Sequence, residues 1–179
     1  MLKKEIIKEE RKILSPWVTL LERTVKKGNE NTTYHSFEQD DYVSIIAINE
    51  NKEILLVKQY RPAVDKITIE LPGGLLELGE TPESCARKEL IEETGYEAVG
   101  QLHSLGNYCP DTGRLANRFY GFYCSTLKKL DEWSPENGVD PFFLSLKELP
   151  DYLNDSKLDN ALHIALIYKA LFNQCFKVA

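Results

Sequence analysis

The sequence predicts an α/β protein of the α+β type, in which helices pack against a mixed sheet and a small β-sheet precedes them. Apolar patterns follow one another in the order strands, helix, strands, helices, which is typical of this architecture. The length of 179 residues is enough for one domain with a core and a small appendage. A hydrophobic content of 42% with 28% charged residues argues against general disorder.

The first forty residues are expected to form the appendage. Polar and apolar side chains alternate in "WVTLLERTV" and "TTYHSFEQ", and Gly28-Asn29 offers a turn between them. This pattern predicts a hairpin or small sheet with a limited core of its own. The expected organisation is therefore a β subdomain over residues 1–40 and a main domain over residues 41–179.

The main domain opens with strands that are buried on both faces. Segments 42–48 and 53–60 are almost continuously apolar, and the polar stretch "NENK" joins them. A third short strand is expected over residues 66–71. The remaining expected elements are strands at 99–108, 118–126 and 141–146 and helices at 146–154 and 158–172.

One helix is marked at both ends by residues that favour helix termini. Thr81 is a good N-cap, Pro82 fits the first helical position, and Gly95 can end a helix in the left-handed conformation. The sequence thus predicts a helix over about residues 82–94.

This helix carries three glutamates on one face. Glu89, Glu92 and Glu93 are spaced i, i+3 and i+4, although like charges at these spacings destabilise a helix by roughly 0.2–0.5 kcal/mol per pair. Clustered carboxylates suit Mg²⁺ or Mn²⁺, which also hold substrate phosphates. Gly73 lacks a side chain, so a backbone carbonyl there can approach a metal closely. The alternative is a solvated acidic face.

The whole segment resembles the Nudix box, which is written as Gly, five residues, Glu, seven residues, then Arg-Glu-apolar-any-Glu-Glu-any-Gly-apolar. The matching residues are Gly74, Glu80, Lys88, Glu89, Leu90, Glu92, Glu93, Gly95 and Tyr96. Six identical glycines and glutamates are expected by chance on the order of once in ten million frames. The chain is accordingly identified as similar to the Nudix hydrolases, and the resemblance implies a Nudix-type α/β/α sandwich.

The resemblance also implies roles for the box residues. It makes Glu89, Glu93 and Glu92 metal ligands together with the Gly73 carbonyl, and it implies water attack on a diphosphate linkage assisted by the metal. The family's box arginine is Lys88 here, which lacks the planar fork that would orient Glu80. This departure bears on catalytic rate more than on metal binding.

Flanking residues resemble the ADP-ribose and nucleotide-sugar pyrophosphatases. In that branch a "QYR" strand precedes "ELPGG", so Arg61 would contact the phosphates or base and Glu70 would hold polar groups nearby. Ordinary strand-end chemistry is the alternative for Arg61. Pro110 stands fifteen residues after Gly95, as in the branch. Its polar loop would reach the terminal sugar through side chains that could equally serve a turn: Asp111, Asn117 and Arg118.

Two further features follow from the same resemblance. The branch has a swapped N-terminal sheet that forms a homodimer and stacks an aromatic side chain on the base. Trp17 and Tyr34 are the candidates, with a buried core position as the alternative. A carboxylate on a late loop activates the water in this branch. Glu136 is favoured as this base among four acidic residues, the others being Asp131, Glu132 and Asp140.

Charge and cysteine content limit the partners and the location. The net charge of −6 argues against non-specific nucleic-acid or membrane binding. The four cysteines show no zinc spacing, and free thiols in a reducing cytoplasm are expected. The expected function is hydrolysis of ADP-ribose or another nucleoside diphosphate sugar. A dinucleoside polyphosphate, cofactor or nucleoside triphosphate substrate, or a non-catalytic nucleotide sensor, remains as an alternative.

Overall fold

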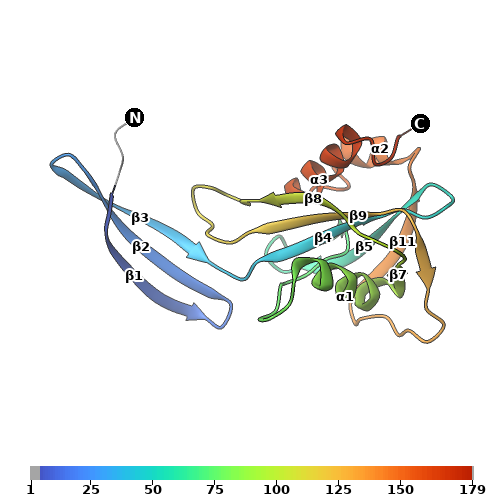
Figure 1. Cartoon of the computed structure of the whole chain (residues 1–179), viewed down its shortest axis with the longest axis horizontal. Helices are drawn as coiled ribbons and strands as arrows, with labels where there is room; N and C mark the ends of the chain where they lie inside the picture. Colours follow the sequence, from blue (N-terminus) through green and yellow to red (C-terminus); the bar gives the residue numbers. More distant parts are fainter. Residues whose placement is uncertain (1–4, 179) are drawn as a thin grey trace. The chain divides into compact units, whose positions relative to one another are not determined.

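A computed structural model describes residues 5–178 and divides the chain into two compact units (Figure 1). Unit 1 contains the described residues up to Asp41 together with Tyr108–Phe119. Unit 2 contains Tyr42–Asn107 and Tyr120 onward. The predicted boundary near residue 40 coincides with the first division of the chain, whereas the return of residues 108–119 to unit 1 has no counterpart in the prediction.

Unit 1 is built on a three-stranded antiparallel sheet in the order β1-β2-β3. The strands are β1 (Glu5–Ser15), β2 (Val18–Lys27) and β3 (Glu30–Glu38). Gly28 adopts φ +63° in the turn before β3, a conformation that glycine reaches without steric cost. The alternation in the sequence thus forms a sheet, as predicted for this region. Most of its side chains are exposed, although Leu21 is fully buried.

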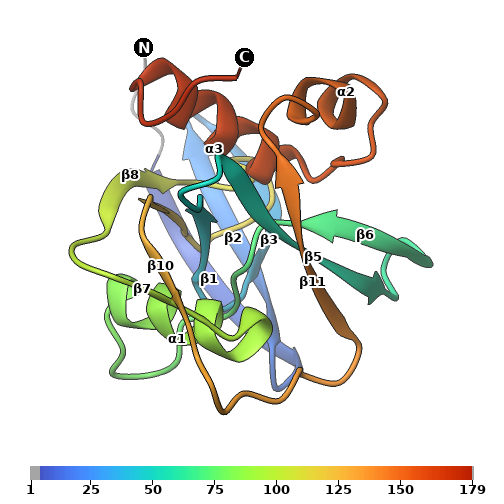
Figure 2. The same ribbon diagram turned by 90° about the vertical axis from the view of Figure 1, so that its right-hand side faces the viewer.

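Among residues 5–178, unit 2 contains the helices and the remaining strands, apart from the strand-end residues Tyr108 and Phe119, which belong to unit 1. The strands form the groups β4-β9-β8, β11-β5-β6 and β10-β7. Helix α1 lies on one side of them, and α2 and α3 lie on the other (Figures 1 and 2). The bounds are β4 (Tyr42–Ala47), β5 (Glu53–Arg61), β6 (Lys66–Glu70), α1 (Pro82–Thr94), β7 (Tyr96–Ala98), β8 (His103–Tyr108), β9 (Phe119–Cys124), β10 (Leu127–Lys129), β11 (Val139–Ser145), α2 (Leu149–Asn154) and α3 (Ala161–Phe172).

The core of unit 2 joins α1 to the central strands. Strand β4 is buried along nearly all of its length, as its continuous apolar run predicted. Strand β5 is buried only over residues 54–57, and Lys58, Tyr60 and Arg61 are exposed, so the expectation of burial on both faces was wrong for its second half. The strand expected from residue 99 begins only at His103, because Gly100 turns the chain with φ +81°. The short strands β7 and β10 were not predicted. The part of the core that includes residues of α1 consists of Val43, Ile45, Ala47, Leu55, Cys85, Ala86, Leu90, Ala98, Leu102, Phe122 and Cys124.

The structure also bears on the state of the cysteines and on membrane-spanning helices. All four cysteines are free, and Cys85 and Cys124 are buried. Across residues 5–178, none of the helices has the length and apolar character that a membrane crossing requires.

Candidate active site

Helix α1 presents the acidic face and is fixed at both ends as predicted. The Thr81 hydroxyl accepts a hydrogen bond from the Ser84 backbone N–H at 3.1 Å, and Ser84 Oγ accepts a hydrogen bond from the Thr81 backbone N–H at 3.0 Å. Pro82 stands at the start of the helix, and Gly95 ends it with φ +73°. Leu90, spaced i, i+3 with Glu93 and so close to it around the helix, is buried in the core, and this packing fixes the orientation of the helix about its axis.

The segment before the helix brings backbone close to the glutamates. The Val43 N–H donates to the Gly74 carbonyl and the Ile45 N–H to the Pro72 carbonyl, both at 2.9 Å, so residues 72–74 run beside β4. A Cβ on Gly74 would lie 2.5 Å from Oε2 of Glu89, and one on Gly73 would lie 2.1 Å from the Val43 carbonyl oxygen. Close approach of the β4 backbone therefore requires glycine at position 73, whereas a side chain at position 74 would displace the Glu89 carboxylate.

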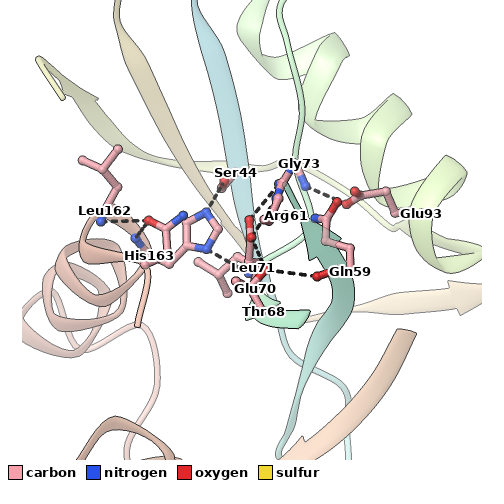
Figure 3. Close-up of polar contacts among 11 residues, drawn as sticks. Ser44, Gln59, Arg61, Thr68, Glu70, Leu71, Gly73, Glu93, Leu162 and His163 are labelled. Atoms are coloured by element: carbon pink, nitrogen blue, oxygen red, sulfur yellow. Dashed lines mark hydrogen bonds and ion pairs between the residues drawn. The ribbon is translucent and has the colours of Figure 1, made fainter. Parts of the chain in front are cut away.

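Glu89 and Glu93 place their carboxylates beside Gly74 and Gly73. Glu93 is 5% exposed, and its Oε2 accepts a hydrogen bond from the Gly73 N–H at 2.9 Å (Figure 3). Burial and the charges of Glu89 and Glu136 raise the pKa of Glu93 to about 8, although the Gly73 hydrogen bond opposes the rise. Burial and the charge of Glu92 raise the pKa of Glu89 to about 7. Near neutral pH these carboxylates need a compensating cation to stay ionised.

The third box glutamate and the lysine differ from this pair. Glu92 is exposed and lines a cavity with Glu89. Lys88 Nζ lies 2.9 Å from Glu77 Oε1 and 3.1 Å from Glu80 Oε1, so it bridges two carboxylates. The hydrogen bond from Lys88 lowers the pKa of Glu80. The sequence singled out Glu80 and Lys88 as partners, whereas Glu77 was missed because it occupies one of the five unspecified positions between Gly74 and Glu80.

The donor set fits a divalent cation held largely by water and phosphate. Among residues 5–178, no three His, Cys, Asp or Glu side chains are close enough together to form a ready-made metal site. Mg²⁺, however, usually keeps several waters and takes only one or two carboxylates together with substrate phosphates. Glu89 and Glu93 can supply those carboxylates. The Gly73 backbone lies beside Glu93, and the role of its carbonyl as a further ligand stays a prediction.

Arg61 and Glu70 lie in the same unit and pair with each other. Arg61 Nε and Nη2 donate to the two carboxylate oxygens of Glu70, each at 2.8 Å (Figure 3). Burial would raise the pKa of Glu70, but the hydrogen bonds from Arg61 and Thr68 hold it below its usual value. Arg61 remains 45% exposed, which leaves it able to meet an anionic group. Both side chains line a cavity of about 170 Å³ that also reaches Gly73 and Gly74.

His163 supports this cavity from helix α3 and was not predicted as a site residue. Its Nδ1 accepts a hydrogen bond from the Leu71 N–H at 3.1 Å, and its Nε2 lies 3.1 Å from Ser44 Oγ (Figure 3). An accepting Nδ1 carries no proton, so the ring is neutral. Burial lowers its pKa to about 4, which keeps it so. Its place three residues after the Asn160 N-cap was visible in the sequence, but its contact with Leu71 spans 92 residues.

The loop between β10 and β11 brings a further carboxylate to the helix. Glu136, Glu89 and Glu92 line a cavity of about 520 Å³ together with Trp133. Among the four acidic residues considered as the base, Asp140 lies within β11 opposite Lys58. Glu136 has a charge close enough to raise the pKa of both Glu89 and Glu93. Trp133 was not predicted, although a tryptophan in a loop this polar was the signal available in the sequence.

The remaining predicted residues belong to unit 1. Trp17 lies in the turn after β1 and is 65% exposed, and Tyr34 on β3 is 47% exposed, so neither is a buried core residue. Asp111 accepts a hydrogen bond from the Gly113 N–H at 2.8 Å, which is turn chemistry. Contacts of these side chains with substrate stay predictions.

Asn117 and Arg118 lie at the end of the segment that returns to unit 1. Asn117 is 3% exposed and donates to the Asp40 carbonyl at 3.0 Å, while its Oδ1 is the buried side-chain atom without a hydrogen-bond partner among residues 5–178. The Arg118 backbone N–H donates to Asp41 Oδ1 at 2.7 Å. Their predicted roles at the sugar likewise stay predictions.

Known proteins resemble both the sequence and the fold. Residues 38–163 match the NUDIX domain. A methanol dehydrogenase activator of Bacillus methanolicus is 34% identical over 136 residues, which cover 72% of this chain and 71% of that protein. An ADP-ribose pyrophosphatase of Bacillus subtilis is 45% identical over 90 residues, or 50% of this chain and 48% of that protein. A GDP-mannose pyrophosphatase of Klebsiella pneumoniae is 31% identical over 121 residues, covering 64% and 60% of the two chains.

The fold has its own counterpart among solved structures. The crystal structure of an ADP compounds hydrolase superposes with a TM-score of 0.83 at 16% identity, over 97% of this chain and 95% of that one. The predicted α/β fold class is thereby confirmed. The chain spans about half the length of the Bacillus subtilis pyrophosphatase that it matches. The resemblance first seen in residues 74–96 extends over residues 38–163, and the chain belongs to the NUDIX domain family.

Proposed function

We propose that this protein hydrolyses the diphosphate linkage of ADP-ribose or another nucleoside diphosphate sugar and releases a nucleoside monophosphate and a sugar phosphate. The observation that carries the proposal is a pair of carboxylates held against Gly73 and Gly74, of which Glu93 is buried and Glu89 is half-buried. The relatives named as ADP-ribose and GDP-mannose pyrophosphatases support the substrate class.

The residues of the box would bind the cation and support one another. Glu89, Glu93 and Glu92 would hold a divalent cation, Mg²⁺ or Mn²⁺, with the Gly73 carbonyl as a further oxygen. Nudix hydrolases generally depend on such cations, and the bound ion neutralises phosphate oxygens and lowers the pKa of a bound water. Lys88 keeps Glu80 in place, since its ammonium lies 3.1 Å from that carboxylate.

The hydrolytic step needs a base and an anchor for the substrate. Glu136 would accept a proton from the attacking water, whose oxygen bonds to one phosphorus as the bridging P–O bond breaks. Arg61 would bind a phosphate oxygen, and Glu70 would keep the guanidinium oriented through its two hydrogen bonds. In unit 1, Trp17 and Tyr34 would stack on the base, and Asp111, Asn117 and Arg118 would contact the sugar.

A panel of substrates tests this proposal. Purified protein is incubated with Mg²⁺ and ADP-ribose, GDP-mannose, other nucleotide sugars, a dinucleoside polyphosphate and nucleoside triphosphates, and nucleoside monophosphate release is measured. Nucleotide sugars should be hydrolysed at least about tenfold faster than the other compounds. Turnover restricted to triphosphates or dinucleoside polyphosphates would favour the alternative substrates. Saturable binding without any turnover would favour a nucleotide sensor.

The assembly and location are proposed on separate grounds. A homodimer formed through unit 1 is supported by exposed apolar side chains on its sheet, among them Ile6, Ile13 and Leu14, which are 55%, 77% and 50% exposed. Light scattering on the wild type and on Ile13→Asp tests this, because a charge there should shift the mass toward a monomer. A cytoplasmic location is supported by four free cysteines.

A further inference from the structure

Trp133 is unusual because it is a large aromatic side chain in a loop of polar and charged residues that nevertheless packs against helix α1. The loop runs from Leu130 to Gly138, between β10 and β11. Trp133 is partly buried, whereas Glu132 and Ser134 on either side of it are exposed. A side chain anchored in this way restricts the conformations of the loop around it.

The indole makes two contacts with the end of α1. Its ring lies over Gly95, where an added Cβ would come within 2.5 Å of Trp133 Cδ2. Its Nε1–H donates to the Glu92 carbonyl at 3.1 Å. That carbonyl belongs to the last turn of the helix, which leaves carbonyls without intrahelical partners. Trp133 therefore satisfies a helix-end carbonyl and uses the open space that only glycine provides.

Further backbone hydrogen bonds fix the ends of the loop. The Leu130 N–H donates to the Gly95 carbonyl at 2.9 Å, and the Val139 N–H donates to the Glu136 carbonyl at 3.1 Å where β11 begins. Glu136 thus lies between the Trp133 anchor and the first residue of β11. Its side chain is exposed and lines the same cavity as Glu89, Glu92 and Trp133.

We propose that Trp133 is a positioning residue that clamps the β10–β11 loop onto the C-terminal end of α1 and so holds Glu136 over the Glu89–Glu92 cavity. The inference rests on the proposed function for its kinetic consequence, since Glu136 acts there as the base. The clamp ties the loop to the same helix that carries the box glutamates. The packing of the Trp133 ring on Gly95 then sets the distance between Glu136 and the carboxylates of α1.

A double-mutant cycle tests the clamp. Trp133→Ala should lower kcat about 10- to 100-fold while KM and the affinity for Mn²⁺ alone stay within about threefold, because only the base is displaced. Trp133→Phe keeps a ring on Gly95 without the N–H and should recover much of the rate. Combining Trp133→Ala with Glu136→Gln should cost little more than Glu136→Gln alone, since both remove the same contribution. Asn137→Ala, an exposed change in the same loop, is the matched control.

A second readout does not depend on activity. Glutamyl endopeptidase should cut after Glu132 or Glu136 at least about fivefold faster in Trp133→Ala than in the wild type or Asn137→Ala, with the sites located by mass spectrometry. Unchanged cleavage would overturn the clamp even if the protein hydrolysed no diphosphate. A kcat near wild type in Trp133→Ala or Glu136→Gln, or fully multiplicative losses in the double variant, would overturn its role in positioning the base.

Discussion

The N-terminal sheet and helix α1 place their side chains in opposite ways. Ile13 on β1 and Trp17 in the turn that follows it are 77% and 65% exposed, and ion pairs such as Arg23 with Glu9 lie on the strands. On the helix, Glu93 is 5% exposed and shares its face with other carboxylates. Apolar groups in solvent and like charges in the interior are each unfavourable for an isolated chain. Under the proposed function, both arrangements would serve binding: the exposed apolar surface would meet a partner or a base, and the acidic helix face would hold a cation.

The largest effect on activity is expected when the buried carboxylate of Glu93 is changed. Glu93→Gln should leave the fold intact, because an amide oxygen can still accept the Gly73 N–H, while kcat falls at least ~10²-fold as a ligand charge is lost. Steady-state kinetics with Mg²⁺ measure this. Glu83→Gln, which changes an exposed glutamate in the first turn of the same helix, should keep near wild-type activity. Turnover within a few-fold of wild type in Glu93→Gln would remove Glu93 from the metal site.

A substitution of Trp17 tests the role of the exposed apolar side chains of unit 1. If this indole stacks on the nucleobase, Trp17→Ala should raise KM for ADP-ribose about 5- to 150-fold with little change in kcat, because stacking is worth roughly 1–3 kcal/mol. Its exposure predicts an unchanged melting temperature. Kinetics and thermal unfolding are measured on the same preparation. A destabilised variant with the wild-type KM would assign Trp17 to packing instead.

The burial of Glu93, the partial burial of Glu89 and the repulsion between neighbouring carboxylates should also appear as a pH dependence. Raised folded-state pKa values of about 7 for Glu89 and about 8 for Glu93 mean that the metal-free folded chain binds more protons than the unfolded chain. Stability is therefore lost as pH rises through these values, by about 1–2 kcal/mol between pH 6.5 and 8.5. His163, with a pKa lowered to about 4, contributes the opposite slope only below about pH 6.5.

Thermal unfolding with EDTA or with Mg²⁺ measures this slope. The melting temperature in EDTA should fall by roughly 2–8 °C over that range, and Mg²⁺ should restore it more at pH 8.5 than at pH 6.5. Glu93→Gln should flatten the slope in EDTA. If the melting temperature in EDTA rose with pH instead, the raised pKa values of Glu89 and Glu93 would be contradicted.

The smallest effect is expected at Lys88, whose charge is already paired. Lys88→Arg should match or raise kcat/KM by up to about threefold, because a guanidinium can contact Glu77 and Glu80 with directed hydrogen bonds. Lys88→Met removes both contacts and should lower the rate about tenfold. Both variants are compared with the wild type under saturating Mg²⁺. A large loss in Lys88→Arg would indicate that this site is packed specifically around lysine.

The sequence by itself determined features that depend on neighbours along the chain. Thr81, Pro82 and Gly95 set the bounds of α1 because caps act within one turn. The continuous apolar runs identified β4 and β5, and the box spacing placed three glutamates on one face of the helix. The Glu80–Lys88 pair lies within the same motif, so the box resemblance pointed to it as well.

Only the tertiary structure decided which of these residues are buried and what they meet. Glu89, Glu92 and Glu93 are equivalent by spacing, yet packing of Leu90 into the core turns Glu93 inward and leaves Glu92 exposed. Trp133 reaches the Glu92 carbonyl across 41 residues, and His163 reaches Leu71 across 92. Such contacts depend on how separate elements pack, since burial and long-range hydrogen bonds are properties of the assembled core and not of local sequence.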